Sequence, residues 1–241
     1  MTKLFTNANL FAYSVCIVIT TTLLFGVPTM ARTTDSLKTY KKKRDLTKSP
    51  EPKAIKSSKK TGNIFVIHKH KASHLHYDLR LAFDSVLKSW AVPKGPSLNP
   101  SEKRLAMQVE DHPMDYKDFE GVIPEGYGAG TVMVWDRGTY QNIKEQDGKL
   151  IPFKECLEDG TVEIFFDGEK IKGGYALVRM GDADSNKWLL IKMHDEYASA
   201  RKNPTSTQNK SVKTGRTMAQ IANKEKPSPT TRAKSGQKKK A

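Results

Sequence analysis

The sequence predicts an all-β fold in which about eight short strands form a small closed antiparallel β-barrel. From residue 63 to residue 198, short runs rich in Val, Ile, Phe, Tyr and Trp alternate with Gly, Pro, Asn and Asp, as strands and turns do. A sheet of eight strands must also close or stack in order to hide its edges, so we expect a barrel, with a sandwich as the alternative. The candidate strands are residues 64–69, 75–83, 87–92, 105–109, 130–136, 161–166, 174–179 and 187–193.

The amino-terminal leader is open to two interpretations. Between Lys3 and Arg32 the chain carries no charged side chain, and residues 10–27 are apolar enough for a secretory signal or a membrane anchor. Met30, however, opens a stretch that is typical of the start of a cytosolic protein. We expect a cytoplasmic, nucleoid-associated protein, and export or membrane anchoring through residues 4–29 is the alternative.

The net charge of +15 is concentrated in two flanking segments. Residues 32–60 hold 11 Lys and Arg against 3 acidic residues, and residues 201–241 hold 12 against 1, whereas residues 61–200 hold 17 basic and 22 acidic side chains. Basic arms of this kind attract phosphate groups without sequence preference, and plain solvated tails are the alternative. The chain thus divides into an apolar leader, a basic arm, a folded domain and a disordered basic tail: residues 1–29, 30–62, 63–198 and 199–241.

Histidines form the densest group of potential metal ligands in the chain, since five of the six lie between positions 68 and 112. In the run 74–83, strand alternation places the polar side chains on one face and the large apolar ones on the other. A spacing of two residues sets His76 beside Asp78, which suits one divalent cation, and Arg80 follows where it can hold an anion. A lone histidine is more often a surface residue, but the combination favours a metal site.

Two neighbouring segments extend this polar face. His68 and His70 share one face of the preceding run, so a hairpin through residues 71–73 would bring a third ligand to the metal. Further along, the same alternation places Gln108, Glu110 and His112 on a common face. Pro113 biases His112 toward an extended backbone. An ordinary polar turn is the alternative for this second segment.

Residues 69–80 (KHKASHLHYDLR), 88–97 (KSWAVPKGPS) and 109–116 (VEDHPMDY) together resemble the signature blocks of the 3'-phosphoesterase module of bacterial DNA ligase D. The resemblance covers about residues 38–198. It implies a small β-barrel enzyme that uses Mn²⁺, or another divalent ion such as Zn²⁺ or Co²⁺, to remove a 3' ribonucleotide and then a 3' phosphate. The product would be a 3'-hydroxyl end in DNA repair by non-homologous end joining.

The same resemblance implies roles for individual residues. A metal is expected on two histidines and one aspartate, and the phosphate on an arginine and a histidine, with four further residues in support. As a non-ligand catalytic residue, His112 would either donate a proton to the leaving oxygen or stabilise the transition state as a cation. The expected metal ligands are His70, His76 and Asp78, the catalytic residues are His112, Arg80 and Tyr116, and Lys94, Arg104 and Glu110 join Arg80 and His112 at the phosphate and DNA.

The chain departs from the family pattern in two respects. The glycine loop of residues 123–130 is one residue shorter than usual between its second glycine and Tyr127. No Lys-x-Asp-Gly ligase signature occurs, and no polymerase module fits in 241 residues. We therefore expect a stand-alone phosphoesterase that acts on DNA 3' ends of primer-templates, alongside a separate ligase, a polymerase and end-binding repair proteins. No stable membrane partner is expected unless the apolar leader is translated and acts as a signal or anchor.

Two other functions fit parts of the sequence. One is a non-catalytic protein that binds DNA ends through its basic arms. The other is an exported metal-dependent phosphatase, which only the apolar leader favours.

Overall fold

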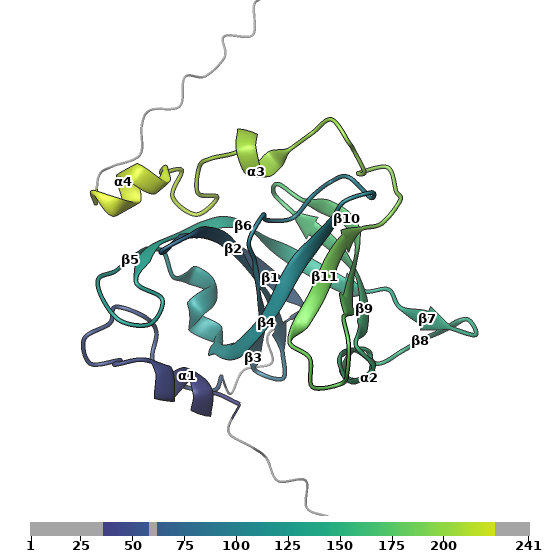
Figure 1. The fold of residues 1–241 in the computed structure, drawn as a ribbon, viewed down its shortest axis with the longest axis horizontal. Coiled ribbons are helices and arrows are strands. Elements are labelled where there is room, and N and C mark those ends of the chain that lie inside the picture. The colour runs from purple at the N-terminus through teal and green to yellow at the C-terminus, as the bar shows by residue number, and fades with distance from the viewer. Residues whose placement is uncertain (1–35, 58–61, 225–241) are drawn as a thin grey trace, which may run out of the picture. The chain divides into compact units, whose positions relative to one another are not determined.

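Eight strands close into an antiparallel barrel, as the sequence predicts (Figure 1). A computed structural model describes residues 36–57 and 62–224. The ring runs in the order β1-β2-β3-β4-β11-β10-β9-β6, and β6 pairs back with β1. Its strands are β1 (Ile64–Lys71), β2 (Leu75–Phe83), β3 (Val86–Val92), β4 (Lys103–Pro113), β6 (Gly130–Asn142), β9 (Thr161–Gly168), β10 (Lys172–Arg179) and β11 (Lys187–Lys192).

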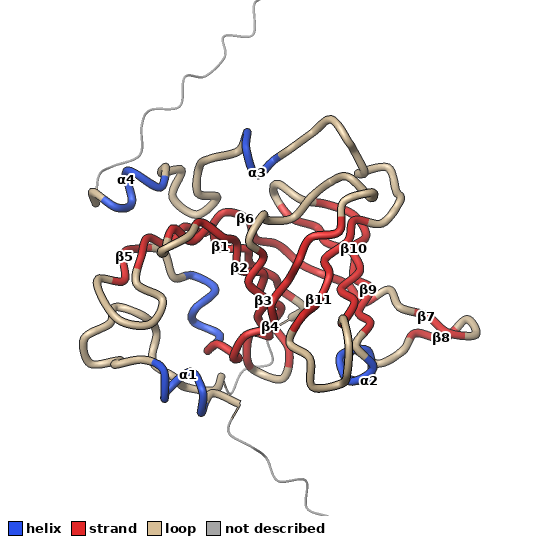
Figure 2. Tube along the Cα trace, in the orientation of Figure 1, coloured by secondary structure: helices blue, strands red, loops and turns tan. Residues whose placement is uncertain are grey.

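Short strands and helices lie outside the eight-stranded ring (Figure 2). Strand β5 adds to the edge of β6, and β7 pairs with β8 in a separate two-stranded ribbon. None of these three strands, nor any of the helices, was among the expected elements. Their bounds are α1 (Lys38–Lys43), the 3-10 helix η1 (Met114–Asp118), β5 (Gly121–Ile123), β7 (Glu145–Gln146), β8 (Lys149–Leu150), α2 (Phe153–Asp159), α3 (Pro204–Thr207) and α4 (Met218–Ala222).

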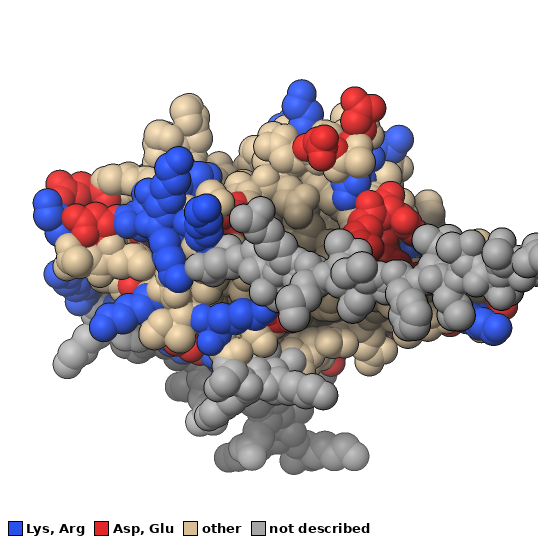
Figure 3. Space-filling view, turned by 90° about the horizontal axis from the view of Figure 1, so that it is seen from below, with Lys and Arg blue, Asp and Glu red and all other residues tan. Residues whose placement is uncertain are grey.

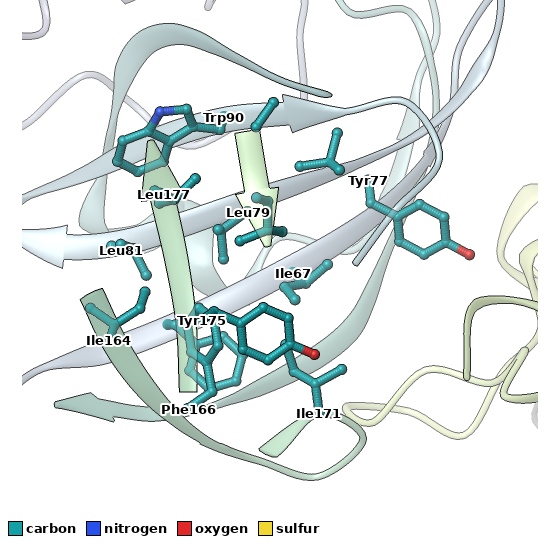
Figure 4. Close-up of a cluster of buried hydrophobic side chains, with 14 of the residues drawn as sticks. Ile67, Tyr77, Leu79, Leu81, Trp90, Ile164, Phe166, Ile171, Tyr175 and Leu177 are labelled. Atoms are coloured by element: carbon teal, nitrogen blue, oxygen red, sulfur yellow. The ribbon is translucent and has the colours of Figure 1, made fainter. Parts of the chain in front are cut away.

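The barrel interior holds the main hydrophobic core (Figure 4). On β2, Tyr77, Leu79 and Leu81 are buried in this core, where they pack with residues such as Trp90 of β3. Because neighbouring side chains on a strand point to opposite faces, the alternate residues of β2 lie on the outer face of the barrel wall. The candidate metal ligands therefore sit outside the core.

The basic amino-terminal arm covers part of that outer face. Leu37 and Tyr40 are both buried, and Tyr40 packs in a second apolar cluster with Leu87, Met114 and Tyr116. Two apolar residues three positions apart lie on one side of a helical turn, which explains why α1 forms where the lysine-rich composition suggested an extended arm. Residues 36–57 of the arm are thus an ordered part of the domain wall.

The segment 199–224 also differs from the disordered tail that its composition predicts. Its chain packs back on the barrel: the backbone N–H of Val212 donates to the carbonyl of Val134, and Ile221 of α4 is buried. Glu120 anchors it, because its carboxylate accepts hydrogen bonds from the hydroxyls of Ser211 and Thr214. A few buried anchors outweigh a polar composition here. Residues 225–241 lie outside the described part of the chain.

We expect Glu120→Gln to lower the free energy of unfolding by about 1–3 kcal/mol, the usual cost of unmatched buried polar groups. The carboxylate also accepts from Arg216 and from the backbone N–H of Val134, and an amide cannot accept at both of its ends. Urea denaturation measures the change. Glu145→Gln, at an exposed position of β7, is the matched control, and equal stability of the two variants would contradict the anchoring role.

The apolar leader lies outside the described residues. Within residues 36–57 and 62–224, no helix combines the length and the apolar character that crossing a bilayer requires.

Candidate metal centre

Strands β1 and β2 form the predicted hairpin and carry most of the site. In their antiparallel register His70 lies opposite His76, and His68 lies opposite Asp78. These four side chains therefore share the outer face with Arg80, as the period-two pattern predicts. His74 is exposed and precedes the strand, so only its carbonyl contributes, through a contact with the ring of His76.

His70, His76 and Asp78 form a group suited to one cation. Their three ligand atoms all lie within 4.8 Å of one another. Nδ1 of His70 lies 3.6 Å from Oδ2 of Asp78, and Nε2 of His76 lies 3.6 Å from Oδ1. Two imidazoles and a carboxylate are a mixed donor set that ions such as manganese, zinc or cobalt accept.

The other nitrogen of each imidazole is held by the backbone. Nε2 of His70 lies 3.0 Å from the carbonyl oxygen of Gly128, and Nδ1 of His76 lies 3.0 Å from that of His74. A carbonyl only accepts, so these nitrogens carry the protons. The lone pairs of the remaining nitrogens then face Asp78, which is the arrangement that a metal-binding histidine needs. The residues present thus fit a divalent cation.

Arg80 joins the candidate metal ligands to the rest of the cavity. Its guanidinium donates to Nδ1 of His68 at 3.3 Å, to Oγ of Ser89 at 2.9 Å and to Oδ2 of Asp78 at 3.2 Å, and it lies 4.7 Å from the ring centroid of Tyr116. Three of its five N–H groups are used, so two are left for a phosphate. Although burial opposes it, the Arg80 charge holds the pKa of Asp78 well below its usual range.

Ser89 lies between Arg80 and His112. Its hydroxyl donates to the carbonyl of Leu87 and lies 3.3 Å from Nδ1 of His112. Ser89→Ala is expected to lower the free energy of unfolding by about 1–3 kcal/mol, because the variant leaves a buried guanidinium N–H without its acceptor. Thermal and urea denaturation test this, with the exposed Ser101→Ala as control. If Ser89→Ala lowered the free energy of unfolding no more than Ser101→Ala does, Ser89 would not be an important acceptor for Arg80.

His112 is the last residue but one of β4, and its side chain is buried. Its Nδ1 lies 2.9 Å from the carbonyl oxygen of Glu110, so Nδ1 carries the proton and Nε2 is an acceptor. Nη2 of Arg44 lies 3.1 Å from that Nε2. Burial, with Arg80 and Arg44 nearby, lowers the pKa of His112 well below its usual value. The ring is therefore neutral at pH 7 in this structure.

A bulge in β4 corrects one prediction from alternation. The pairing with β3 shifts by one residue between Leu87 opposite His112 and Ser89 opposite Val109. Glu110 and His112 face the cavity, but Gln108 lies on the core side, where its Oε1 accepts from Nε1 of Trp188. An extra residue in one strand reverses the facing of everything beyond it. The expected common face therefore holds for Glu110 and His112 only.

Two residues of the basic arm complete the site, and the sequence reasoning missed both. Arg44 donates to Oε1 of Glu110 at 2.7 Å and to Oε1 of Glu51 at 2.9 Å, and all three side chains are buried. The hydroxyl of Tyr116 also donates to Glu51 at 3.0 Å. Their only sequence signal was an Arg and a Glu within a polar, lysine-rich segment, and such a segment resembles a tail.

The resulting cavity of about 190 Å³ gathers seven of the nine predicted site residues. Lys94 and Arg104 do not line it. They border a different cavity, beside Pro93 and Lys103, where Arg104 pairs with Glu102. The residues around the first cavity include His70, His76, Asp78, Arg80, Glu110, His112 and Tyr116, together with Arg44, Glu51 and Tyr127.

Two buried neutral histidines predict a pH dependence of stability. Burial, reinforced by Arg80, lowers the pKa of His68 to about 3, and the pKa of His112 is also depressed. Both groups bind a proton in the unfolded chain near pH 6.5 but not in the folded chain, so stability is full above pH 6.5 and is lost as the pH falls toward 3. We expect about 1 kcal/mol per pH unit for each histidine, measured by urea denaturation with chelator present. His68→Gln should flatten the slope, and a flat wild-type profile from pH 6.5 to 4.5 would contradict the prediction.

The glycine loop brings a backbone carbonyl and an aromatic ring to the cavity. Gly126 and Gly128 have φ angles of 86° and 81°, a conformation that favours glycine, and they flank Tyr127. At Gly130 a Cβ atom would collide with the backbone of Lys71, so only glycine lets the loop approach the β1–β2 turn. The shortened loop still places the Gly128 carbonyl against His70.

The folded domain is similar in sequence to a known protein family and to several known proteins. Residues 68–179 match the family model described as the DNA Ligase D 3'-phosphoesterase domain. The multifunctional non-homologous end joining protein LigD of Pseudomonas aeruginosa is 47% identical over 163 residues, which is 66% of this chain and 19% of that protein. The corresponding proteins of Mycobacterium tuberculosis and Mycolicibacterium smegmatis are 42% identical over 67% of this chain, and over 20% and 21% of their own lengths. The chain thus spans about a fifth of the length of these curated relatives.

Proposed function

Through residues 68–179 this chain belongs to the DNA ligase D 3'-phosphoesterase domain family, and from that premise we propose that it hydrolyses phosphate esters at the 3' ends of DNA. The observation that carries the proposal is the convergence of His70, His76 and Asp78 beside Arg80 and His112 in one cavity. A site for a cation next to a site for an anion suits a phosphate group.

The reaction has two successive steps. Water first hydrolyses the diester between the DNA strand and a 3'-terminal ribonucleoside. A 3' phosphate remains only if the bond from phosphorus to the 5' oxygen breaks, with hydroxide added to phosphorus and a proton to that oxygen. Water then hydrolyses the 3' monoester to give a 3'-hydroxyl and inorganic phosphate. Such ends are the substrates of ligases and polymerases, so we place the chain in non-homologous end joining.

The side chains divide the work between binding and proton transfer. His70, His76 and Asp78 would hold a divalent cation, which when bound neutralises charge on a phosphate oxygen. The two remaining N–H groups of Arg80 bind the other oxygens. The ring of His112 is neutral, and its Nε2 is an acceptor that faces Nη2 of Arg44. We assign to Nε2 the proton that the attacking water loses, once that water replaces Arg44 as the partner of Nε2. Both roles suggested by the sequence require a protonated ring, which the burial of His112 disfavours.

The lysine-rich helix α1 provides the electrostatic contact with the rest of the DNA. Figure 3 views the side of the molecule on which α1 lies, and Lys and Arg side chains gather on that face. Basic side chains beside the cavity attract the phosphate backbone without reading its sequence. Cytoplasmic placement, with a separate ligase and polymerase acting on the products, belongs to the same proposal.

The test uses purified residues 30–241 and two primer-templates, one ending in a single 3' ribonucleotide and one in a 3' phosphate. Each is incubated with manganese, zinc or cobalt and with chelator, and the products are separated by gel electrophoresis. Metal-dependent conversion of both substrates to a 3'-hydroxyl end is the expected result. Binding of the DNA without conversion under any of these metals would overturn the enzymatic proposal in favour of end binding alone.

A further inference from the structure

A second cavity adjoins the candidate metal centre. It measures about 290 Å³ and lies between the basic arm and the glycine loop. The cavity of about 190 Å³ around His70, His76 and Asp78 is called the metal cavity below. The side chains of Arg44, Glu51 and Tyr127 line both cavities. A molecule bound at the metal centre can therefore extend directly into the second cavity, which we call the arm cavity.

Tyr127 stands at the junction of the two cavities. It is 47% exposed, whereas the other tyrosine that lines the metal cavity, Tyr116, is buried. Nζ of Lys43 lies 4.6 Å from the centroid of the Tyr127 ring and 3.2 Å from its hydroxyl, and the guanidinium of Arg44 lies 5.1 Å from the same centroid. An exposed aromatic ring supported by cations is the usual platform on which a nucleobase stacks.

The charges around the arm cavity indicate a neutral occupant. Its charged lining side chains are balanced, three basic and three acidic, in contrast to a channel for a polyanionic backbone. Carboxylates repel a second phosphate but accept hydrogen bonds from sugar hydroxyls. The six residues are Lys43, Arg44, Lys48, Asp45, Glu51 and Glu125.

We propose that the arm cavity binds the 3'-terminal nucleoside that lies beyond the scissile phosphate, with its base stacked on Tyr127. This inference rests on the proposed function and adds to it a subsite for the leaving nucleoside. A cavity of this size holds one nucleoside and no duplex, which matches a group that occurs only once, at the end of the strand. The subsite is used in the diester step and is empty in the monoester step.

The test compares the two steps in one variant. Tyr127→Leu should lower kcat/KM about tenfold on the primer-template ending in a ribonucleotide, the order expected for the loss of one stacked base. Its kcat/KM on the 3'-phosphate substrate should stay within about twofold of wild type, because no nucleoside then lies beyond the phosphate. Tyr127→Phe keeps the ring and should retain both activities, which controls for the hydrogen bond from Lys43.

A second substrate makes the assignment specific to the base. A primer ending in 1-deoxyribose keeps both sugar hydroxyls but has no base to stack. The kcat/KM of wild type should be about tenfold lower on this primer than on the ribonucleotide-ended primer. Tyr127→Leu should show no further decrease, because the missing base and the missing ring abolish the same contact.

Three outcomes would overturn the subsite. The first is an equal loss of kcat/KM for Tyr127→Leu on the ribonucleotide-ended and the 3'-phosphate primer-templates, and the second is no loss on either. The third is that the losses caused by the variant and by the missing base multiply. An equal loss would instead place the last nucleoside of the DNA strand on Tyr127. An inactive wild type rejects the proposed function itself and is recognised without any variant.

Discussion

His76→Ala is expected to reduce both hydrolytic steps by more than about a hundredfold. His76 supplies one of three potential ligand atoms that lie within 4.8 Å of one another, and its Nε2 faces Asp78 because Nδ1 is held by a carbonyl. A bound cation contributes several kcal/mol of charge stabilisation, and each 1.4 kcal/mol changes the rate tenfold, so loss of the cation costs about two or more orders of magnitude. Turnover of the two primer-templates at saturating manganese measures the loss.

Two controls separate a missing ligand from a damaged fold. His74→Ala removes an exposed histidine two residues away and should retain wild-type activity. Chelator should reduce wild type to the level of His76→Ala and leave that variant unchanged. Isothermal titration should also show weaker manganese binding to the variant. Full activity of His76→Ala in the presence of chelator would contradict the metal centre.

His112→Ala is expected to lower kcat by about 10²–10⁴, the range of general acid or base catalysis. The reason is the position of Nε2, which is unprotonated and faces the cavity next to Arg80 and Arg44. KM and manganese affinity should change little, because the ring is not among the three converging ligands. Steady-state kinetics on the 3'-phosphate primer, with titration of the metal, measures all three quantities.

The comparison with other histidines tests this role. His194 does not line the metal cavity, so His194→Ala serves as the control. A variant that binds manganese as wild type does but has lost turnover supports proton transfer. If His112→Ala instead lost manganese binding in parallel with activity, the ring would be part of the metal centre and the assignment of the proton would be wrong.

Much of the fold follows from local sequence because each strand carries its own pattern. In β2, alternate residues are apolar and pack in the core, so Asp78 and Arg80 had to share the opposite face with His76. The turn between β2 and β3 is equally local, since Asp84 and Ser85 both adopt positive φ, as a two-residue hairpin requires. The common face of His76, Asp78 and Arg80 was predictable for this reason, whereas His70 was singled out as a candidate ligand only by the resemblance to the ligase D family.

The parts of the site that were not predictable depend on contacts between distant segments. Arg44 and Glu51 are ordinary residues of a lysine-rich arm until they meet Glu110, 66 residues along the chain from Arg44. Composition cannot report such a pairing. The same holds for the segment 199–224, in which one buried carboxylate, that of Glu120, orders a polar stretch. Gln108 was misplaced for a different reason, because a bulge has no sequence mark.

The order of pairing in the barrel has a consequence for its biosynthesis. Every residue that lines the metal cavity has been synthesised by position 128, yet β4 has no neighbour on one side until β11 is made, with Leu105 opposite Leu189. Until then the nascent chain carries an open strand edge, the kind of surface that pairs with other chains. The Glu120 carboxylate waits longer still, for Arg216. The candidate metal ligands are therefore synthesised early, but the barrel wall that holds them closes late. A chain stalled before residue 187 is then exposed to chaperones and proteases.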